Sequence, residues 1–171
     1  PPSLTDGDLI DAPSYGKAEE LSLDPRREPG FVQWIGAAQV SGKPLTITEW
    51  NVPYPIVDRF TAPLYVAGVA ALQGWDAPML YAYSHEPLRQ PGGASEWASF
   101  HDPAITGVMP AAALLYRRGH VAPAAKAYHL ALTPEQLFNR DLSPRTSATI
   151  RTLVEQSRLT IGLPAAKDLP W

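Results

Sequence analysis

The sequence predicts an α/β protein built from successive strand–helix units with parallel strands. Short runs of β-branched and aromatic residues alternate along the chain with longer segments whose apolar residues follow helical spacing. These helical segments are roughly ten to sixteen residues long, the length of a crossover between parallel strands. With 171 residues, 45% of them hydrophobic and 18% charged, the chain is large enough for a sizeable core.

The first strand–helix unit is expected in the N-terminal third. Residues 7–16 place Leu9 and Ile10 between turn formers, which is typical of a short strand running into a loop. A helix should follow and end near Gly42, which suits a left-handed terminal position. Its apolar residues have helical spacing: Phe31, Trp34, Ile35 and Ala38.

The second strand is expected over residues 44–49, PLTITE, and it ends on a carboxylate. Leu45 and Ile47 alternate with two threonines, a pattern that suits a largely covered strand. Glu49 breaks this pattern, because an ionised carboxylate is costly to bury without partners. Functional groups gather at the carboxyl ends of parallel strands, so Glu49 is a candidate for catalysis. The alternative is an ordinary surface glutamate.

Two further helices and one strand complete the predicted units. A helix over residues 60–75, capped by Thr61, should bury one apolar face that consists of Phe60, Leu64, Ala67, Gly68, Ala71, Leu72 and Trp75. We expect Trp34, Trp75 and Phe60 in the core. The third strand is expected over 77–84, and a loop over 85–101 follows it. The last helix should begin after Asp102, end at Gly119 and be kinked or split by Pro110.

The pattern changes after Val121. Thr133 opens a capping box with proline at the first helical position, a second helix is expected around 144–158, and residues 158–164 have the composition of a strand. We therefore assign residues 1–122 to the strand–helix units. Residues 123–171 are assigned to a mostly helical tail, a linker or the start of a following domain.

Composition and charge exclude several classes of function. A net charge of −3 without a basic stripe argues against nucleic acid and anionic membranes as partners, and no apolar run reaches the roughly 18 residues of a membrane span. The absence of cysteine excludes disulfides and thiolate metal sites, and the four histidines lack metal-binding spacing. No dinucleotide, P-loop or serine-hydrolase motif is present, so we expect no cofactor. Localisation stays open; a secreted or periplasmic protein fits.

The run KPLTITEWN resembles the nucleophile strand, the seventh, of clan A glycoside hydrolases, which are retaining (β/α)8-barrel enzymes. The neighbouring segments fit the same register, since IDAPSYG resembles the sixth strand and GWDAPMLYAYSH resembles the eighth. The resemblance covers roughly residues 7–122. It implies that this region is the C-terminal portion of a TIM barrel, about three βα units, and that the protein degrades poly- or oligosaccharides.

The resemblance also implies a set of site residues. Glu49 would be the nucleophile of the retaining mechanism, and Tyr15 would hold its orientation by a hydrogen bond. Aromatic side chains after the eighth strand would form a floor beneath the sugar, because aromatic faces pack against the apolar side of a sugar ring. The implied substrate-binding residues are Tyr15, Trp50, Asn51, Tyr83 and His85, with Trp97 either lining the cleft or covering the top of the barrel.

Two departures limit the predicted activity. Pro13 stands where the sixth strand of this clan often has histidine. The acid/base of the clan follows an asparagine at the end of the fourth strand, and this sequence contains no Asn-Glu pair. Since a barrel needs about 250 residues, we expect a fragment that is inactive alone and whose partners are a carbohydrate and either the N-terminal barrel portion or a second copy. The alternatives are a non-catalytic carbohydrate-binding barrel and an α/β interaction scaffold.

Overall fold

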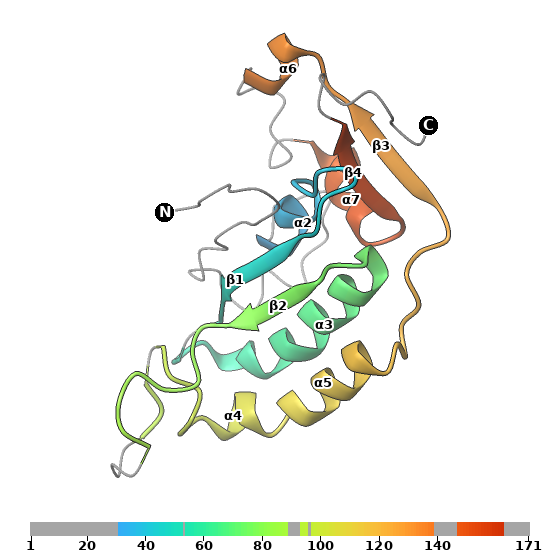
Figure 1. The fold of residues 1–171 in the computed structure, drawn as a ribbon. Coiled ribbons are helices and arrows are strands. Elements are labelled where there is room, and N and C mark those ends of the chain that lie inside the picture. Colours follow the sequence, from blue (N-terminus) through green and yellow to red (C-terminus); the bar gives the residue numbers. More distant parts are fainter. Residues whose placement is uncertain (1–30, 53, 89–92, 96, 139–146, 163–171) are drawn as a thin grey trace.

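A computed structural model describes residues 31–52, 54–88, 93–95, 97–138 and 147–162. The predicted strand near Leu9 and Ile10 lies outside these residues, as do Pro13 and Tyr15. Figure 1 shows the described elements, which are α2 (Phe31–Gly36), β1 (Thr46–Trp50), the 3-10 helix η1 (Val57–Thr61), α3 (Ala62–Gln73), β2 (Ala77–Leu80), α4 (Pro103–Thr106), α5 (Met109–Arg117), β3 (Ala127–Ala131), α6 (Pro134–Phe138), α7 (Ala148–Val154) and β4 (Arg158–Gly162).

The strands form two small parallel sheets, so the mixed α/β class predicted from the sequence is confirmed. β1 pairs with β2 and β3 pairs with β4, both in parallel. The segment before β1 joins the second sheet through a parallel bridge between Val40 and Ile161. The N–H groups of Ser41 and Ile161 donate to the carbonyls of Ile161 and Gln39, over 2.8 and 2.7 Å. This segment therefore links the two sheets, and the partial barrel stays a prediction.

β1 carries one extra residue relative to β2. The ladder shifts between two flanking pairs, which are Ile47↔Pro78 and Trp50↔Leu80. Thr48 and Glu49 thus stand opposite a single residue of β2, as in a β-bulge. A bulge bends the strand and changes the direction in which its side chains point. Bulges are frequent at barrel rims and next to active sites.

The bulge changes which positions of the strand are buried. Odd-numbered residues are buried before it and even-numbered apolar residues after it, namely Leu45, Ile47, Trp50 and Val52. By simple alternation Glu49 would follow Ile47 into the core. The extra residue instead leaves Glu49 half-buried at the end of the strand. The bulge thus gives the carboxylate its place at the edge of the core.

Helix α3 packs beside the β1–β2 pair, and α5 covers α3 (Figure 1). The predicted apolar face is partly wrong, because Phe60 is 47% exposed and Leu64 is 41% exposed. Ala67 and Ala71 of that face are buried as predicted. The other buried residues of the helix are Ala62, Pro63, Val66, Val69, Ala70 and Gln73. Trp75 is buried, as predicted. The side chain of Trp34 lies outside what the structure describes.

The segment after Val121 contains a strand that the sequence analysis missed. β3 and β4 are joined through α6 and α7, so this region repeats the strand–helix–strand order with parallel strands. Its residues Val154 and Leu159 belong to the same hydrophobic core as Ile35 and Ile47. The division at residue 122 stays a prediction, but the described part of the second segment packs into the core of the first.

Gln73 holds the two segments together. This side chain is fully buried at the end of α3. Its amide nitrogen donates to the carbonyls of Val154 and Ser157 over 2.5 and 2.6 Å, and its amide oxygen accepts from the N–H of Leu159 over 3.0 Å. Each polar atom is thus used, and three backbone groups between α7 and β4 depend on this one side chain.

The predicted helix ends are mostly confirmed. Asp102 caps α4 by accepting from the N–H of Ala104 over 3.0 Å. The long predicted helix is split, at Gly107 and Val108, so that Pro110 lies in the first turn of α5. Thr133 and Gln136 form the expected capping box. Thr61 makes no side-chain cap, because η1 runs directly into α3.

Gly42 has the predicted positive φ, +76°, but in a different element. Helix α2 ends at Gly36, well before it. Gly42 lies instead in a tight turn that the N–H of Lys43 closes on the carbonyl of Val40 over 3.1 Å. Its left-handed backbone turns the chain from the second sheet into β1.

Candidate functional site

The carboxyl ends of β1 and β2 bring most of the predicted site residues into one region. The N–H of Tyr81 donates to the carbonyl of Trp50 over 2.9 Å, which continues the parallel pairing past the last residue of β2. Glu49 is half-buried one residue before this contact. Tyr83 and His85 follow in the chain segment that leaves β2. Tyr15, the predicted partner of Glu49, lies outside the described residues.

Asn51 attaches the loop after β2 to the end of β1. Its side chain is 97% buried, and its amide nitrogen donates to the carbonyls of Tyr81 and Trp97 over 2.8 and 3.3 Å. One amide thus holds two points of the loop that are sixteen positions apart in sequence. The residue that the resemblance places in the sugar site acts here as an organiser of the loop that carries the aromatic side chains.

Backbone hydrogen bonds join the two limbs of this loop. The N–H of Ala82 donates to the carbonyl of Trp97, and the N–H groups of Ser99 and Phe100 donate to the carbonyls of Ala82 and Tyr83, over 2.9 to 3.0 Å. The hydroxyl of Ser99 donates to the carbonyl of Ala82 as well, over 3.1 Å. The loop is therefore a defined platform and not merely an extended connection.

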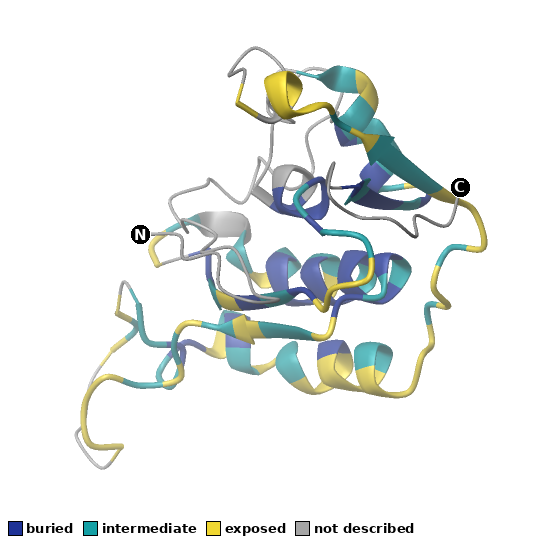
Figure 2. Ribbon diagram, turned by 45° about the horizontal axis from the view of Figure 1, so that its top comes forward, coloured by how far each residue is buried: buried dark blue, intermediate teal, exposed yellow. Residues whose placement is uncertain are grey.

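Six rings gather on this platform, which we call the aromatic platform: Tyr81, Tyr83, His85, Trp97, Phe100 and His101. Tyr81 meets His85 and Trp97 edge-to-face, with ring centroids 5.0 and 6.4 Å apart. Phe100 lies between Tyr83 and His101, at centroid distances of 5.3 and 4.5 Å. Tyr81 is 39% exposed and Tyr83 is 55% exposed. Figure 2 shows this end of the molecule largely in the colours of intermediate and exposed residues.

A buried ion pair supports the platform from below. Arg59 donates from Nε and Nη2 to the two carboxylate oxygens of Asp102, over 2.5 and 2.9 Å, and from Nη1 to the carbonyl of Ile56. Burial raises the pKa of Asp102, but the hydrogen bonds from Arg59 and from the Ala104 N–H outweigh it, so the pKa lies below its ordinary value. The same hydrogen bond raises the pKa of Arg59. Arg59 thus ties η1 to the start of α4.

Trp50 does not lie on the platform. Its side chain is 97% buried in the core, where it lines an apolar groove between β2, α3 and α5. Since the bulge moves Trp50 onto the buried side of the strand, the indole packs among core residues while Glu49 stays at the rim. Trp50 therefore does not contact the platform surface. It can shape the site only indirectly, by packing beneath β1.

The predicted site does not include three residues of the platform, which are Tyr81, Phe100 and His101. The signal that identifies them is spatial, because the backbone pairing between residues 82–83 and 97–100 brings distant rings together. Within the part of the chain that the structure describes, no cluster of three metal-binding side chains occurs, and no helix has the length and apolarity needed to cross a membrane.

Comparisons with protein-family models, with curated proteins and with solved structures give no match to this chain.

Proposed function

We propose that this chain carries the nucleophile of a retaining β-glycosidase, and that the nucleophile is Glu49. In this reaction a carboxylate attacks the anomeric carbon and forms a covalent glycosyl intermediate, which water then hydrolyses. The observation that carries the proposal is the bulge in β1, which leaves Glu49 half-buried at the carboxyl end of a strand that pairs with the start of the aromatic platform.

The aromatic platform supports a carbohydrate as the substrate. Exposed aromatic faces bind sugars through the apolar C–H side of the ring, while polar groups bind the hydroxyls. Tyr81 and Tyr83 expose large parts of their rings close in the chain to the β1–β2 pairing, and Asn51 fixes the platform to the strand that carries Glu49. The hydrogen bonds of Asn51 thus join the aromatic platform to the strand that carries the carboxylate.

The resemblance to clan A glycoside hydrolases implies that the acid/base of the proposed reaction lies outside residues 1–171. Retaining hydrolysis needs a second carboxyl about 5 to 5.5 Å from the first, with a raised pKa, to protonate the leaving oxygen. Asp102 is unsuitable, because Arg59 occupies both of its oxygens and its pKa is lowered. In the proposed enzyme this group belongs to an Asn-Glu pair at the end of an earlier strand, roughly 80 to 120 residues before Glu49.

A mechanism-based label tests the proposal on a protein that includes such an upstream Asn-Glu pair. A 2-deoxy-2-fluoro-β-glycoside with a good leaving group forms a long-lived ester with the nucleophile of a retaining enzyme. We expect the label on the peptide that contains Glu49, detected by mass spectrometry. Glu49→Gln should abolish labelling, and Glu135→Gln, an exposed change in the first turn of α6, should not.

Two other results would separate the alternatives. Retained sugar binding without labelling or hydrolysis would favour a carbohydrate-binding barrel that has lost catalysis. Labelling of another carboxylate would reject Glu49 as the nucleophile and leave the hydrolase class in place.

A further inference from the structure

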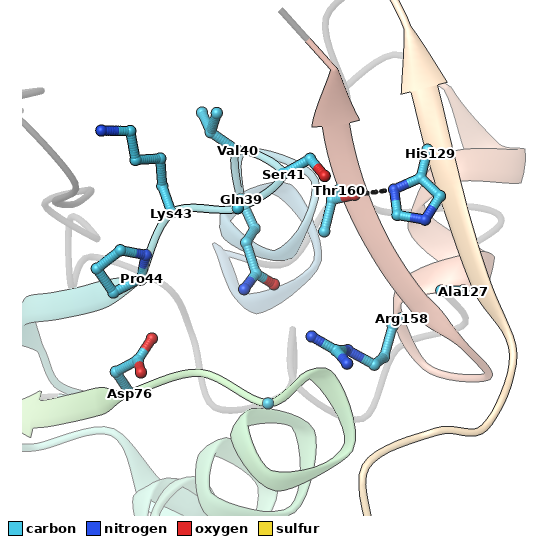
Figure 3. A pocket seen from close by; sticks show the side chains of 12 residues that line it. Gln39, Val40, Ser41, Lys43, Pro44, Asp76, Ala127, His129, Arg158 and Thr160 are labelled. Carbon is cyan, nitrogen blue, oxygen red and sulfur yellow. Dashed lines mark hydrogen bonds between the residues drawn. The ribbon is translucent and has the colours of Figure 1, made fainter. Parts of the chain in front are cut away.

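A second site candidate lies at the opposite ends of β1 and β2 from Glu49. A cavity of about 650 Å³ opens between the two sheets, within the range of small-molecule sites. Pro44 and Asp76, which come just before β1 and β2, line one side. Ala127 and His129 of β3 and Arg158 and Thr160 of β4 line the other, and Gln39 lies between them (Figure 3).

Gln39 lines this cavity and has an unused hydrogen-bond acceptor, its side-chain oxygen, buried beside it. The residue is only 4% exposed, and its side-chain oxygen has no hydrogen-bond partner among the described residues. Its position is fixed, because its carbonyl accepts from the N–H of Ile161 over 2.7 Å. Figure 3 shows its amide directed into the cavity. A buried amide oxygen without a donor is costly, so this geometry favours a bound hydroxyl or amine group at that point.

Arg158 and Asp76 direct charged groups into the same space. Nε of Arg158 donates to the carbonyl of Gln73 over 3.2 Å, which leaves its two terminal nitrogens without a partner in the described part of the chain. One carboxylate oxygen of Asp76 accepts from the N–H of Leu45 over 2.9 Å, and the other has no hydrogen-bond partner among the residues that the structure describes. These side chains extend into the cavity from different sides in Figure 3, and they form no ion pair with each other.

We propose that this cavity binds a small carboxylate that also carries hydroxyl groups, such as a uronate or an aldonate. The ligand carboxylate would accept from the terminal nitrogens of Arg158, in the planar two-bond geometry that guanidinium favours. Its hydroxyls would donate to the side-chain oxygen of Gln39 and to the free oxygen of Asp76. This proposal does not rest on the role proposed for Glu49, because no residue is shared.

The lining excludes two simpler ligands. A neutral sugar would satisfy Gln39 and Asp76 but would leave the guanidinium of Arg158 without an anion. Inorganic phosphate would satisfy Arg158 but offers few hydrogen-bond donors to Gln39 and Asp76. Only a ligand that combines one anionic group with several hydroxyl donors can form hydrogen bonds with all three side chains, Gln39, Asp76 and Arg158.

Titration calorimetry of the chain with D-glucuronate and D-gluconate tests the proposal. For ligands of this size we expect a dissociation constant of about 1 mM for at least one of the two. D-glucose, acetate and inorganic phosphate should each bind at least about tenfold more weakly, since each lacks one part of the recognised group. Similar affinity for acetate, phosphate and glucuronate would overturn the assignment, because it would show a general anion site.

Gln39→Met keeps the length of the side chain and removes the unused acceptor. It should weaken binding of the sugar acid about tenfold while the midpoint of thermal unfolding stays constant or rises, because the ligand-free protein loses an unsatisfied buried group. Arg158→Gln should weaken binding of the acid but not of D-glucose. Arg117→Gln, an exposed change on α5, should alter neither.

Two outcomes overturn the proposal. One is the absence of any binding by both sugar acids at concentrations of about 20 mM, well above the expected dissociation constant. The other is a large loss of thermal stability in Gln39→Met with unchanged binding, which would show that the Gln39 amide is structural.

Discussion

The two ends of the β1–β2 pair differ in how their buried polar groups are used. At the carboxyl end, Asn51 and Asp102 are bonded to backbone or to Arg59, and what the region exposes is aromatic. At the amino end, the side-chain oxygen of Gln39 and the terminal nitrogens of Arg158 have no hydrogen-bond partner among the described residues, and both side chains line a cavity. At the carboxyl end, Nε1 of Trp50 also lacks such a partner, but its ring is packed in the apolar core. An unsatisfied group therefore points to a ligand only together with further polar groups directed into the same cavity, as at the amino end.

The largest expected effect is the loss of the ion pair under the platform. Asp102→Ala should lower the free energy of unfolding by about 3 kcal/mol, because it leaves the Arg59 guanidinium buried without its anion and removes the cap of α4. Urea denaturation of the chain measures this. A change in the free energy of unfolding of less than about 0.5 kcal/mol would contradict this comparison of the two ends, because the platform would then not depend on its satisfied polar groups.

The next effect contrasts two buried glutamines. Gln73→Leu should destabilise the chain by about 2 kcal/mol, since it leaves three backbone groups between α7 and β4 without a partner. Gln39→Met should not destabilise it, because Gln39 leaves its oxygen unused. The two variants are measured side by side by urea denaturation. Equal losses would contradict the distinction between satisfied and unsatisfied groups.

A smaller effect concerns pH. The folded-state pKa of Asp102 is lowered, so its contribution to stability is complete above the unfolded value of about 3.9 and is lost as the pH falls through the folded value. Asp102→Asn keeps an N-cap acceptor but cannot ionise. The stability difference between the unchanged chain and Asp102→Asn should shrink as the pH falls from roughly 6 to 3. A constant difference would reject the sign of this shift.

The smallest effect on stability is expected on the aromatic platform. Tyr83→Ala removes a ring that is more than half exposed, so the free energy of unfolding should change by no more than about 0.5 kcal/mol. Binding of soluble β-linked oligosaccharides, followed by tryptophan fluorescence or NMR, should nevertheless weaken about tenfold. Phe138→Ala, which alters an exposed ring on α6 away from the platform, is the matched control. Unchanged binding in Tyr83→Ala would remove the platform from the proposed site.

Sequence patterns predicted the regular parts of this fold well. The alternation of Leu45 and Ile47 located β1, and the capping signals at Asp102 and Thr133 placed the helix starts, because these signals depend on neighbours in the chain. β3 was missed, since AYHLA has no β-branched residue and its alternation is limited to Tyr128 and Leu130 around His129. It forms a strand because β4 lies beside it, a contact that sequence spacing does not reveal.

The buried face of α3 was misjudged for a related reason. The helix is apolar nearly all round, so two stripes have equally good spacing. The stripe that packs ends in Gln73. Glutamine is usually exposed, and its burial here is explained only by its three backbone partners, which the sequence does not reveal. Likewise, the aromatic platform depends on pairing between residues distant in sequence. Local patterns could therefore place Glu49 at a strand end, but not the rings beside it.

The bulge in β1 has a consequence for how such a strand can evolve. Its single extra residue determines on which face each later side chain of the strand lies, because strand side chains alternate between faces. A deletion of position 49 would remove the bulge and leave Trp50 two positions after Ile47, on the same buried face, because the shortened strand alternates regularly. The loss of one codon at this point can thus remove the rim carboxylate while the buried face of the strand stays as it is.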